Sequence, residues 1–340
     1  MSSLTIELLK TVGSPFTTSD YNPSPQSLKK LYSYATKNRM PLLYLESLRK
    51  HGDLGSLQEE HKKLIDRYTK TERAIARISK VLQESGIDYV LFKSVRPYME
   101  VTVDIDALIF GHMYKEALRI IRSAGYRYLG GGPLSTTFRD DETRINMDIY
   151  NEVGVSYVIY LDKYALAGCV SDRVLLNGAL VRSLSSESDL LAVIAHSIIK
   201  EHMYVLSEYY TTLYYLAEMN QESLESFLFL ANRCKINSSV KTHLGITALL
   251  HYEAHQTMPE RLIWLLEKLH ANSLELSRVS EDFFMPHKYH PLTIIKALQE
   301  KLGEGKARRS FAYQTMRALN PKFAYSLAKD VLHHISRETY

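Results

Sequence analysis

The spacing of apolar residues changes from an extended to a helical pattern near residue 185, and this change constrains the fold most strongly. Before it, short apolar segments bounded by glycine, proline or acidic turns are typical of strands. One amphipathic helix over 111–125 interrupts them. After it, apolar residues recur every three to four positions, which indicates helices. The pattern predicts an α+β fold, in which a small mixed β-sheet domain is flanked by helices and followed by a mostly α-helical domain.

This pattern divides the chain into three expected segments. Residues 1–57 form an N-terminal helical segment, where an irregular stretch precedes two short helices interrupted near Pro41. Residues 58–184 form the sheet domain, which a long helix over 57–84 opens, and residues 185–340 form the helical domain. Strands are expected over 87–92, 101–110, 126–129, 136–139 and 144–150, and the last segment's helices over 186–203, 206–219, 222–234, 239–254, 259–270, 291–302, 307–318 and 322–336.

The composition is that of an ordinary folded protein. The chain has 340 residues, 45% hydrophobic and 24% charged, which excludes disordered and fibrous classes. The apolar run 190–199 is too short for a membrane span and contains His196, and the first ten residues lack a secretory signal pattern. Cys169 and Cys234 have no metal-binding spacing and are expected to be buried thiols. We therefore expect a cytoplasmic protein without membrane contact.

Two aspartates lie two positions apart in the apolar strand candidate 103–109. Side chains alternate along a strand, so Asp104 and Asp106 are expected on one face. The apolar neighbours expected to point into the core are Val103, Ile105 and Ala107. Neighbouring carboxylates repel each other unless a cation lies between them, and such oxygen ligands suit a Mg²⁺ ion that also binds substrate phosphates. The alternative is a solvated acidic edge strand, although Asp is rare in strands.

A third carboxylate strengthens the metal interpretation. Asp148 stands alone among apolar residues in the strand candidate 144–150. A strand beside the one that carries Asp104 would complete a triangular acidic cluster. Asp140 and Asp141 are alternatives for this role, but they lie in an expected turn, where acidic residues are common. Asp148 is therefore preferred.

These segments resemble the DNA polymerase β-like nucleotidyltransferase superfamily, and most of all its poorly characterised archaeal and bacterial members. The stretches that carry the resemblance are Tyr89-Val90-Leu91-Phe92-Lys93-Ser94-Val95-Arg96-Pro97, Val103-Asp104-Ile105-Asp106-Ala107-Leu108-Ile109 and Met147-Asp148-Ile149. The run 190–197 is similar to a helix that follows the catalytic domain in such proteins. The catalytic part of the resemblance covers about 70 residues.

The resemblance implies an enzyme that moves a nucleoside monophosphate from an NTP to an acceptor hydroxyl and releases pyrophosphate. In that superfamily three carboxylates hold two divalent ions, Mg²⁺ or Mn²⁺, that bridge nucleotide phosphates and activate the acceptor. The matching residues are Asp104 and Asp106, expected on both ions, and Asp148, expected on the acceptor-side ion and as the candidate base. The resemblance does not identify the acceptor, for which RNA, a protein side chain and a small molecule are the alternatives.

The sequence departs from the superfamily in the segment that holds the triphosphate. Lys93-Ser94 stands where a Gly-Ser pair usually opens a helix. The resemblance assigns nucleotide contacts to Ser94, with backbone N–H groups if a helix begins there. Lys93 and Arg96 are expected to supply positive charge to the phosphates, although Lys93 could instead be a surface lysine at a strand end.

This departure also motivates a second hypothesis of another class. The chain could be a catalytically silent nucleotide-binding or partner-binding regulatory module, such as one half of a toxin–antitoxin pair. A third hypothesis is RNA binding through a basic C-terminal arm, because residues 301–340 hold eight Lys or Arg against three Asp or Glu. The densest part of this arm, Lys306, Arg308 and Arg309, could equally be a solvated helix face.

Other candidate residues have simpler explanations. His251 and His255 lie four positions apart on an expected helix and could bind zinc, but no third ligand is evident. His196 is expected to be a core histidine, with the cleft as the alternative. The tyrosines between 204 and 215 could stack on a base, but their helical spacing favours packing.

Overall fold

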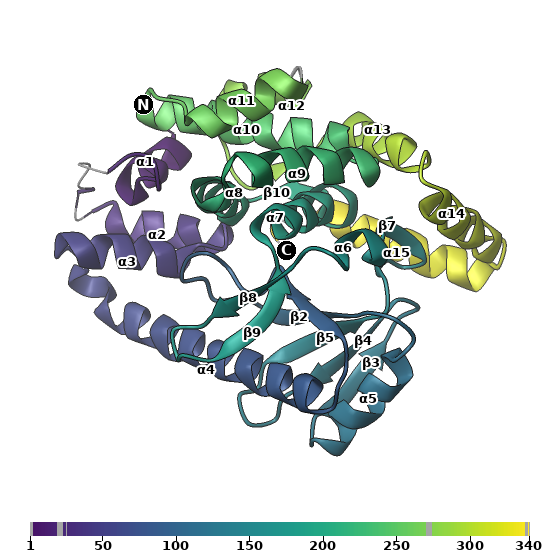
Figure 1. Cartoon of the computed structure of the whole chain (residues 1–340). Coiled ribbons are helices and arrows are strands. Elements are labelled where there is room, and N and C mark those ends of the chain that lie inside the picture. The colour runs from purple at the N-terminus through teal and green to yellow at the C-terminus, as the bar shows by residue number, and fades with distance from the viewer. Residues whose placement is uncertain (1–2, 19–22, 25, 270–273, 337–338, 340) are drawn as a thin grey trace.

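A computed structural model describes residues 3–18, 23–24, 26–269, 274–336 and 339, and it contains both predicted kinds of secondary structure (Figure 1). The helices are α1 (Leu4–Val12), α2 (Leu28–Lys37), α3 (Pro41–His51), η1 (Gly55–Leu57, 3₁₀), α4 (Gln58–Glu84), α5 (Tyr114–Ser123), α6 (Lys163–Leu166), α7 (Ser186–Ala195), η2 (His196–Glu201, π), α8 (Leu206–Glu218), α9 (Gln221–Arg233), α10 (Asn237–His255), α11 (Glu260–Leu269), α12 (Leu274–Asp282), α13 (Pro291–Lys301), α14 (Gly305–Ala318) and α15 (Pro321–Ser336). The strands are β1 (Tyr89–Phe92), β2 (Asp104–Ile109), β3 (Arg127–Gly131), β4 (Ser135–Arg139), β5 (Asn146–Tyr150), β6 (Val153–Val155), β7 (Val158–Leu161), β8 (Val170–Val174), β9 (Leu180–Leu184), β10 (Met203–Tyr204) and β11 (His287–Lys288).

The main sheet has seven strands in the order β3-β4-β5-β2-β1-β9-β8. The pairs β2–β5 and β1–β9 run parallel, and the other neighbours run antiparallel. The predicted mixed sheet is therefore confirmed, as is the α+β class. In the central parallel pair, Asp106 lies opposite Asp148 and Asp104 lies opposite Asn146.

The two faces of this sheet pack against different helices. Helices α4 and α5 cover one face, where Ile105 and Met147 join a buried apolar cluster with residues of both helices. Helices of the second half lie on the other side of the sheet (Figure 1), where Leu108 and Tyr150 belong to the larger cluster. Asp106 shares the face of Leu108 because side chains two positions apart on a strand point the same way. The carboxylates therefore face the helical half.

The larger apolar cluster also links the three expected segments. It contains Leu31 of α2, Phe92 of β1 and Leu213 of α8, all of them fully or almost fully buried. The segment boundaries expected near residues 57 and 184 stay predictions. Within the part of the chain that the structure describes, no helix combines the length and the apolar character needed to cross a bilayer.

Some parts of the fold differ from the prediction. The N-terminal stretch expected to be irregular contains α1, which Ser3 caps and which buries Leu8 and Leu9. Helix α12 and strands β6 to β9 were also not predicted. Val103 is 53% exposed rather than part of the core, because β2 begins only at Asp104. Expected features at residues 19–22, 25, 270 and 337–340, apart from Thr339, lie outside the described residues.

Candidate metal centre

Three carboxylates converge at the face of the sheet that looks toward the helical half. Asp104 and Asp106 come from β2 and Asp148 from β5, as the alternation and the parallel register require. One oxygen atom of each can be chosen so that all three lie within 4.8 Å of one another. In the described part of the chain, this is the one group of three or more acidic, histidine or cysteine side chains close enough to share an ion. The predicted acidic triangle is therefore present.

The carboxylates are buried together, and this crowding shifts their pKa values. Burial and the charge of Asp106 raise the pKa of Asp104 to about 6. Burial and Asp106 also raise the pKa of Asp148, against a hydrogen bond that Thr137 Oγ1 donates over 2.6 Å. Burial acts in the same direction on Asp106, but Lys93 and other nearby cations bring its pKa below the usual value. The cluster therefore has more negative charge than its protein surroundings neutralise, which favours a divalent cation with oxygen ligands.

Lys93 is the cation in direct contact with this cluster. Its Nζ lies 3.0 Å from Oδ2 of Asp106, and its side chain is 7% exposed. The same Nζ donates to Nδ1 of His196 over 3.1 Å, and Nε2 of His196 lies 3.1 Å from Oε1 of Glu201. Burial, Lys93 and Lys200 lower the pKa of His196 to about 3, so its ring is neutral and can accept from the ammonium. Lys93 is thus not a surface lysine at a strand end.

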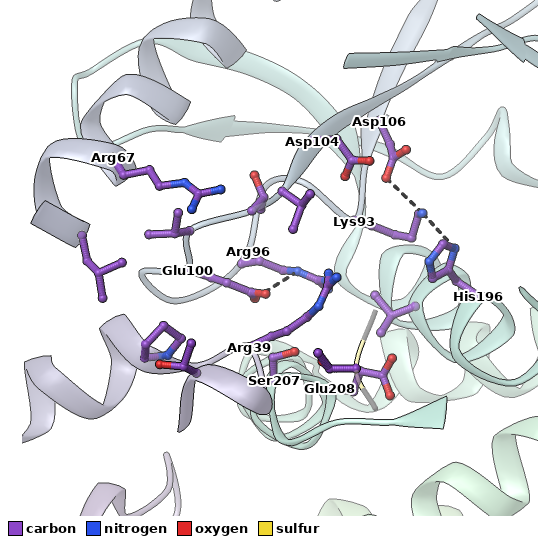
Figure 2. Close-up of a pocket in the computed structure, with 18 of the residues that line it drawn as sticks. Arg39, Arg67, Lys93, Arg96, Glu100, Asp104, Asp106, His196, Ser207 and Glu208 are labelled. Carbon is purple, nitrogen blue, oxygen red and sulfur yellow. Dashed lines mark hydrogen bonds and ion pairs between the residues drawn. The ribbon is translucent and has the colours of Figure 1, made fainter. Parts of the chain in front are cut away.

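His196 differs from the core histidine that the sequence favours. It opens the π-helix η2 and lines the cavity described below, where Figure 2 shows it beside Lys93. A hydroxyl of Tyr160 also lies 3.3 Å from its Nδ1. The apolar run that precedes His196 belongs to α7, and His196 is the first residue of the π-helix that follows.

Ser94 holds the loop rather than opening a helix. The segment between β1 and β2 contains bends but no helix, so the helix N-terminus considered at Ser94 is absent. The hydroxyl of Ser94 donates to the carbonyl of Phe92 over 3.1 Å and accepts from the N–H of Asp106 over 2.7 Å. Ser94 therefore fixes the backbone of a metal-ligand candidate.

A cavity of about 310 Å³ opens beside the carboxylates. Its wall includes Asp104 and Asp106 at one end, and three arginines from separate segments: Arg39 between α2 and α3, Arg67 of α4 and Arg96 of the loop after β1. Figure 2 shows the side chains of Arg39 and Arg96 converging in the cavity. Nε of Arg96 lies 3.3 Å from Oε2 of Glu100, and its Nη1 is buried without a hydrogen-bond partner. The cavity thus joins an acidic end to a basic end.

The alternatives to these residues have structural roles. Asp140 accepts from Arg77 and Thr143 in a turn, and Asp141 pairs with Arg127. Neither belongs to the acidic triangle, whose third carboxylate is that of Asp148; its role in metal binding stays a prediction.

The other sequence candidates lie away from this cavity. The ring nitrogens of His251 face Ser14 Oγ at 3.2 Å and the carbonyl of Thr257 at 2.9 Å, which leaves no free nitrogen for zinc. Cys234 is buried and Cys169 is partly buried, and burial raises the pKa of both thiols. The tyrosines that are fully buried, as packing requires, are Tyr204, Tyr209, Tyr210 and Tyr215.

The basic C-terminal arm is only partly solvated. Nζ of Lys306 lies 2.7 Å from both Glu152 and Asp162, whereas Arg308 and Arg309 are exposed. Helix α14 packs against the β6–β7 hairpin.

Sequence reasoning missed Arg39 of the N-terminal segment and Arg67 of α4, which both line the cavity. They reach it through helix packing that no local pattern reveals. Sequence reasoning also missed Asp189, whose Oδ1 accepts from the N–H of Lys93 over 2.6 Å. Asp189 lies in the polar first turn of α7, where acidic residues are common, so the sequence gives no signal that distinguishes it.

Comparison with known proteins gives no family assignment. The chain matches no protein-family model and no curated protein. Among solved structures, it is similar to a STING-associated CdnE c-di-GMP synthase from Capnocytophaga granulosa, with a TM-score of 0.26 and 13% identity over 82% of this chain and 98% of that one. It is also similar to the Thermotoga maritima CCA-adding enzyme complexed with tRNA, with a TM-score of 0.22 and 11% identity over 73% of this chain and 82% of that one. Both TM-scores are below 0.5, so the function proposed next rests on the geometry of the site.

Proposed function

We propose that this protein is a divalent-metal-dependent nucleotidyltransferase, which moves a nucleoside monophosphate from an NTP to an acceptor hydroxyl and releases pyrophosphate. The observation that carries this proposal is the triangle of Asp104, Asp106 and Asp148, with one oxygen of each within 4.8 Å of the others. Such a triangle beside a cavity with a basic end fits a substrate that brings both a metal ion and a chain of phosphates.

The three aspartates would hold the metal, as Mg²⁺ or Mn²⁺. When bound, such an ion neutralises charge on the reacting phosphate and lowers the pKa of a bound hydroxyl. Asp148 is the proposed base for the acceptor hydroxyl, since its raised pKa favours taking a proton. Thr137 keeps the Asp148 carboxylate oriented through its 2.6 Å hydrogen bond.

The basic end of the cavity would bind the triphosphate. Arg96 was expected there from the sequence, and we add Arg39 and Arg67 because both line the same cavity. Guanidinium groups donate in pairs to phosphate oxygens. Lys93 uses two of its three N–H donors on Asp106 and His196, and the third can reach a phosphate. Ser94 would act by fixing the backbone of Asp106.

The acceptor is proposed to bind outside the triphosphate cavity. Arg308 and Arg309 are exposed and could hold a polyanionic acceptor such as RNA. A protein side chain or a small molecule would not need these arginines. Replacing both arginines by neutral residues should therefore reduce transfer to a nucleic-acid acceptor and leave transfer to a protein or small-molecule acceptor unchanged.

The runner-up function is a silent nucleotide-binding module. It is favoured by one observation, the absence of a helix N-terminus after β1 in the described chain, because that helix would supply backbone donors to phosphate. The intact acidic triangle favours the enzyme, since a module that only binds does not need three carboxylates held together against repulsion.

The test is transfer of label from each of four α-labelled NTPs, with Mg²⁺ or Mn²⁺, into RNA, protein and metabolite fractions. Wild type is compared with Asp104→Asn, which keeps the shape of the side chain and removes its charge. Label that appears with wild type alone supports the proposal and identifies the acceptor class. NTP binding without transfer by folded wild-type protein would support the silent module instead.

A further inference from the structure

We propose that the ammonium of Lys93 is a built-in cation of the carboxylate cluster, which takes the place on Asp106 of one divalent ion, so that the site binds one ion. This inference rests on the proposed function and revises the two ions that the resemblance implies. It concerns which cations balance the cluster, and a metal count can test it separately from activity.

The first support is the position of the ammonium. Nζ of Lys93 lies 3.0 Å from Oδ2 of Asp106, which is the distance of a charge-assisted hydrogen bond. Figure 2 shows this contact at the acidic end of the cavity, with Asp104 beside Asp106. An oxygen that accepts from an ammonium at this distance is not available to bridge two metal ions. One oxygen of each of the three aspartates lies within 4.8 Å of the others, so the cluster still offers three oxygen ligands to one ion.

The second support is the backbone conformation of Lys93. Its φ is 58°, a left-handed conformation that is unfavourable for a residue with a Cβ. The buried carboxylate of Asp189 accepts from the N–H of Lys93 over 2.6 Å, and Tyr215 donates to the other oxygen of Asp189 over 2.6 Å. These contacts hold the strained backbone in place. Strain that the surroundings impose at one residue is typical of functional positions.

The third support is a chain of contacts behind the ammonium. His196 accepts from Lys93, and Nε2 of His196 lies 3.1 Å from Glu201. The π-helix η2 carries both residues, and His202 ends it with φ of 57°. Lys93 is therefore held between a carboxylate and an imidazole, from two sides, and does not need a substrate to position it.

The charges of the cluster agree with one ion. Three ionised carboxylates carry −3 and Lys93 carries +1, which leaves −2 for a single divalent ion to neutralise. Lys200 also acts on the three carboxylates, and its Nζ lies 3.9 Å from Oε1 of Glu201, which carries the opposite charge. In the absence of a nucleotide, two divalent ions would leave the buried cluster with an excess of positive charge, at the desolvation cost of unpaired charges.

The experiment counts Mn²⁺ ions on the full-length protein by electron paramagnetic resonance, with the metal alone and with a non-hydrolysable NTP analogue. Bound Mn²⁺ ions that share a carboxylate give an exchange-coupled spectrum, and a single ion gives an isolated one. The variants are Lys93→Met, Lys93→Arg and, as a matched control, Lys200→Met. The control removes the same charge from a lysine that lies 3.9 Å from Glu201.

We expect one isolated Mn²⁺ in wild type, Lys93→Arg and Lys200→Met, and a coupled pair in Lys93→Met. Two ions in wild type would overturn the inference and leave the proposed function in place. One ion in folded Lys93→Met would also overturn it. If Lys93→Met does not fold by circular dichroism, the wild-type count decides. No bound ion in wild type under either condition would overturn the proposed function, and the inference with it.

Discussion

Two buried carboxylate sites in this protein differ in how far their surroundings neutralise their negative charge. Glu275 of α12 is fully buried, and donors surround it: His287 and Arg278 lie 2.6 and 3.0 Å from Oε2, and the N–H of His290 donates to Oε1 over 2.7 Å. Although burial acts in the other direction, these donors and Thr293 lower the pKa of Glu275 to about 2. The acidic triangle instead places three carboxylates against the one ammonium in direct contact among the described residues, and burial with Asp106 raises the pKa of Asp104 to about 6.

This difference distinguishes two roles of a buried carboxylate. Glu275 stabilises the fold, whereas the rest of the fold must hold the carboxylates of the triangle together. A buried charge with its hydrogen bonds satisfied contributes to stability, and its loss leaves the partners unpaired. A cluster of like charges costs stability until a cation arrives. A buried carboxylate therefore serves structure at α12 and ligand binding at the central β2–β5 pair.

The largest expected effect is on activity at the triangle. Asp148→Asn should reduce nucleotidyl transfer on the order of 10³-fold, because several kcal/mol of transition-state stabilisation depend on the ion and the base that this carboxylate serves. Steady-state rates with labelled NTP measure this loss, and circular dichroism shows whether the fold is kept. Glu275→Gln, assayed well below its melting temperature, should keep wild-type activity. A strong loss in Glu275→Gln and none in Asp148→Asn would reverse the comparison.

The next effect is on stability at α12. Glu275→Gln should lower the free energy of unfolding by about 3 kcal/mol, because it removes the charged partner of a buried ion pair. Urea unfolding of this variant is compared with Glu281→Gln, which changes an exposed residue of the same helix and should fall within about 0.5 kcal/mol of wild type. Equal destabilisation by both variants would contradict the structural role of Glu275.

A smaller effect concerns the basic end of the cavity. Arg67→Gln should raise the KM for NTP about tenfold, since a charged hydrogen bond to phosphate contributes roughly 1.5 kcal/mol. Arg73→Gln is the matched control, because Arg73 is exposed on the same helix and does not line the cavity. If the two variants have the same KM, Arg67 does not contact the triphosphate.

The smallest effect is a pH dependence of opposite sign at the two sites. Asp104 has a raised pKa in the folded state, so its charge destabilises the fold above about pH 6 and ceases to do so below its unfolded pKa near 4. In metal-free buffer, Asp104→Asn should therefore be more stable than wild type above pH 6, on the order of 1 kcal/mol, with no difference near pH 4.

Glu275 should show the reverse. Its pKa is lowered, so its contribution is present above its unfolded pKa near 4.5 and is lost as the pH falls toward 2. The deficit of Glu275→Gln should accordingly shrink between pH 4.5 and 2. Thermal melts at several pH values measure both differences, and parallel curves for the two variants would contradict the assigned charge states.

Much of the sheet could be predicted from the sequence because its central strands are apolar and bounded by turns. Strands β8 and β9 were missed, although the Asn177-Gly178 pair between them is a common hairpin signal, because β8 exposes Val174 and lacks a clear apolar face. The short α1 was missed because nine residues give few helical turns to recognise. Its stability comes from burial against α3 and α10, which local sequence does not show.

The carboxylates of the site were predictable, whereas only two of its cations, Lys93 and Arg96, were identified from the sequence. Alternation along β2 places Asp104 and Asp106 together, and one parallel register brings Asp148 to them. Arg39 and Arg67 reach the cavity only through the packing of the helices and loops that precede β1. Lys93 was identified as a phosphate contact, but its contact with Asp106 depends on a left-handed backbone that no sequence pattern specifies for lysine.

The most direct test of the account is the change in melting temperature on adding Mn²⁺ to EDTA-treated protein. Because the triangle's protein surroundings do not neutralise its negative charge, we expect the melting temperature of wild type to rise by about 2–5 °C at Mn²⁺ concentrations well above the Kd. The rise follows because the ion binds the folded state alone. The same rise should occur in Glu275→Gln and be absent in Asp104→Asn. An equal rise in all three proteins, or none in wild type, would contradict the claim that the triangle is a cation site.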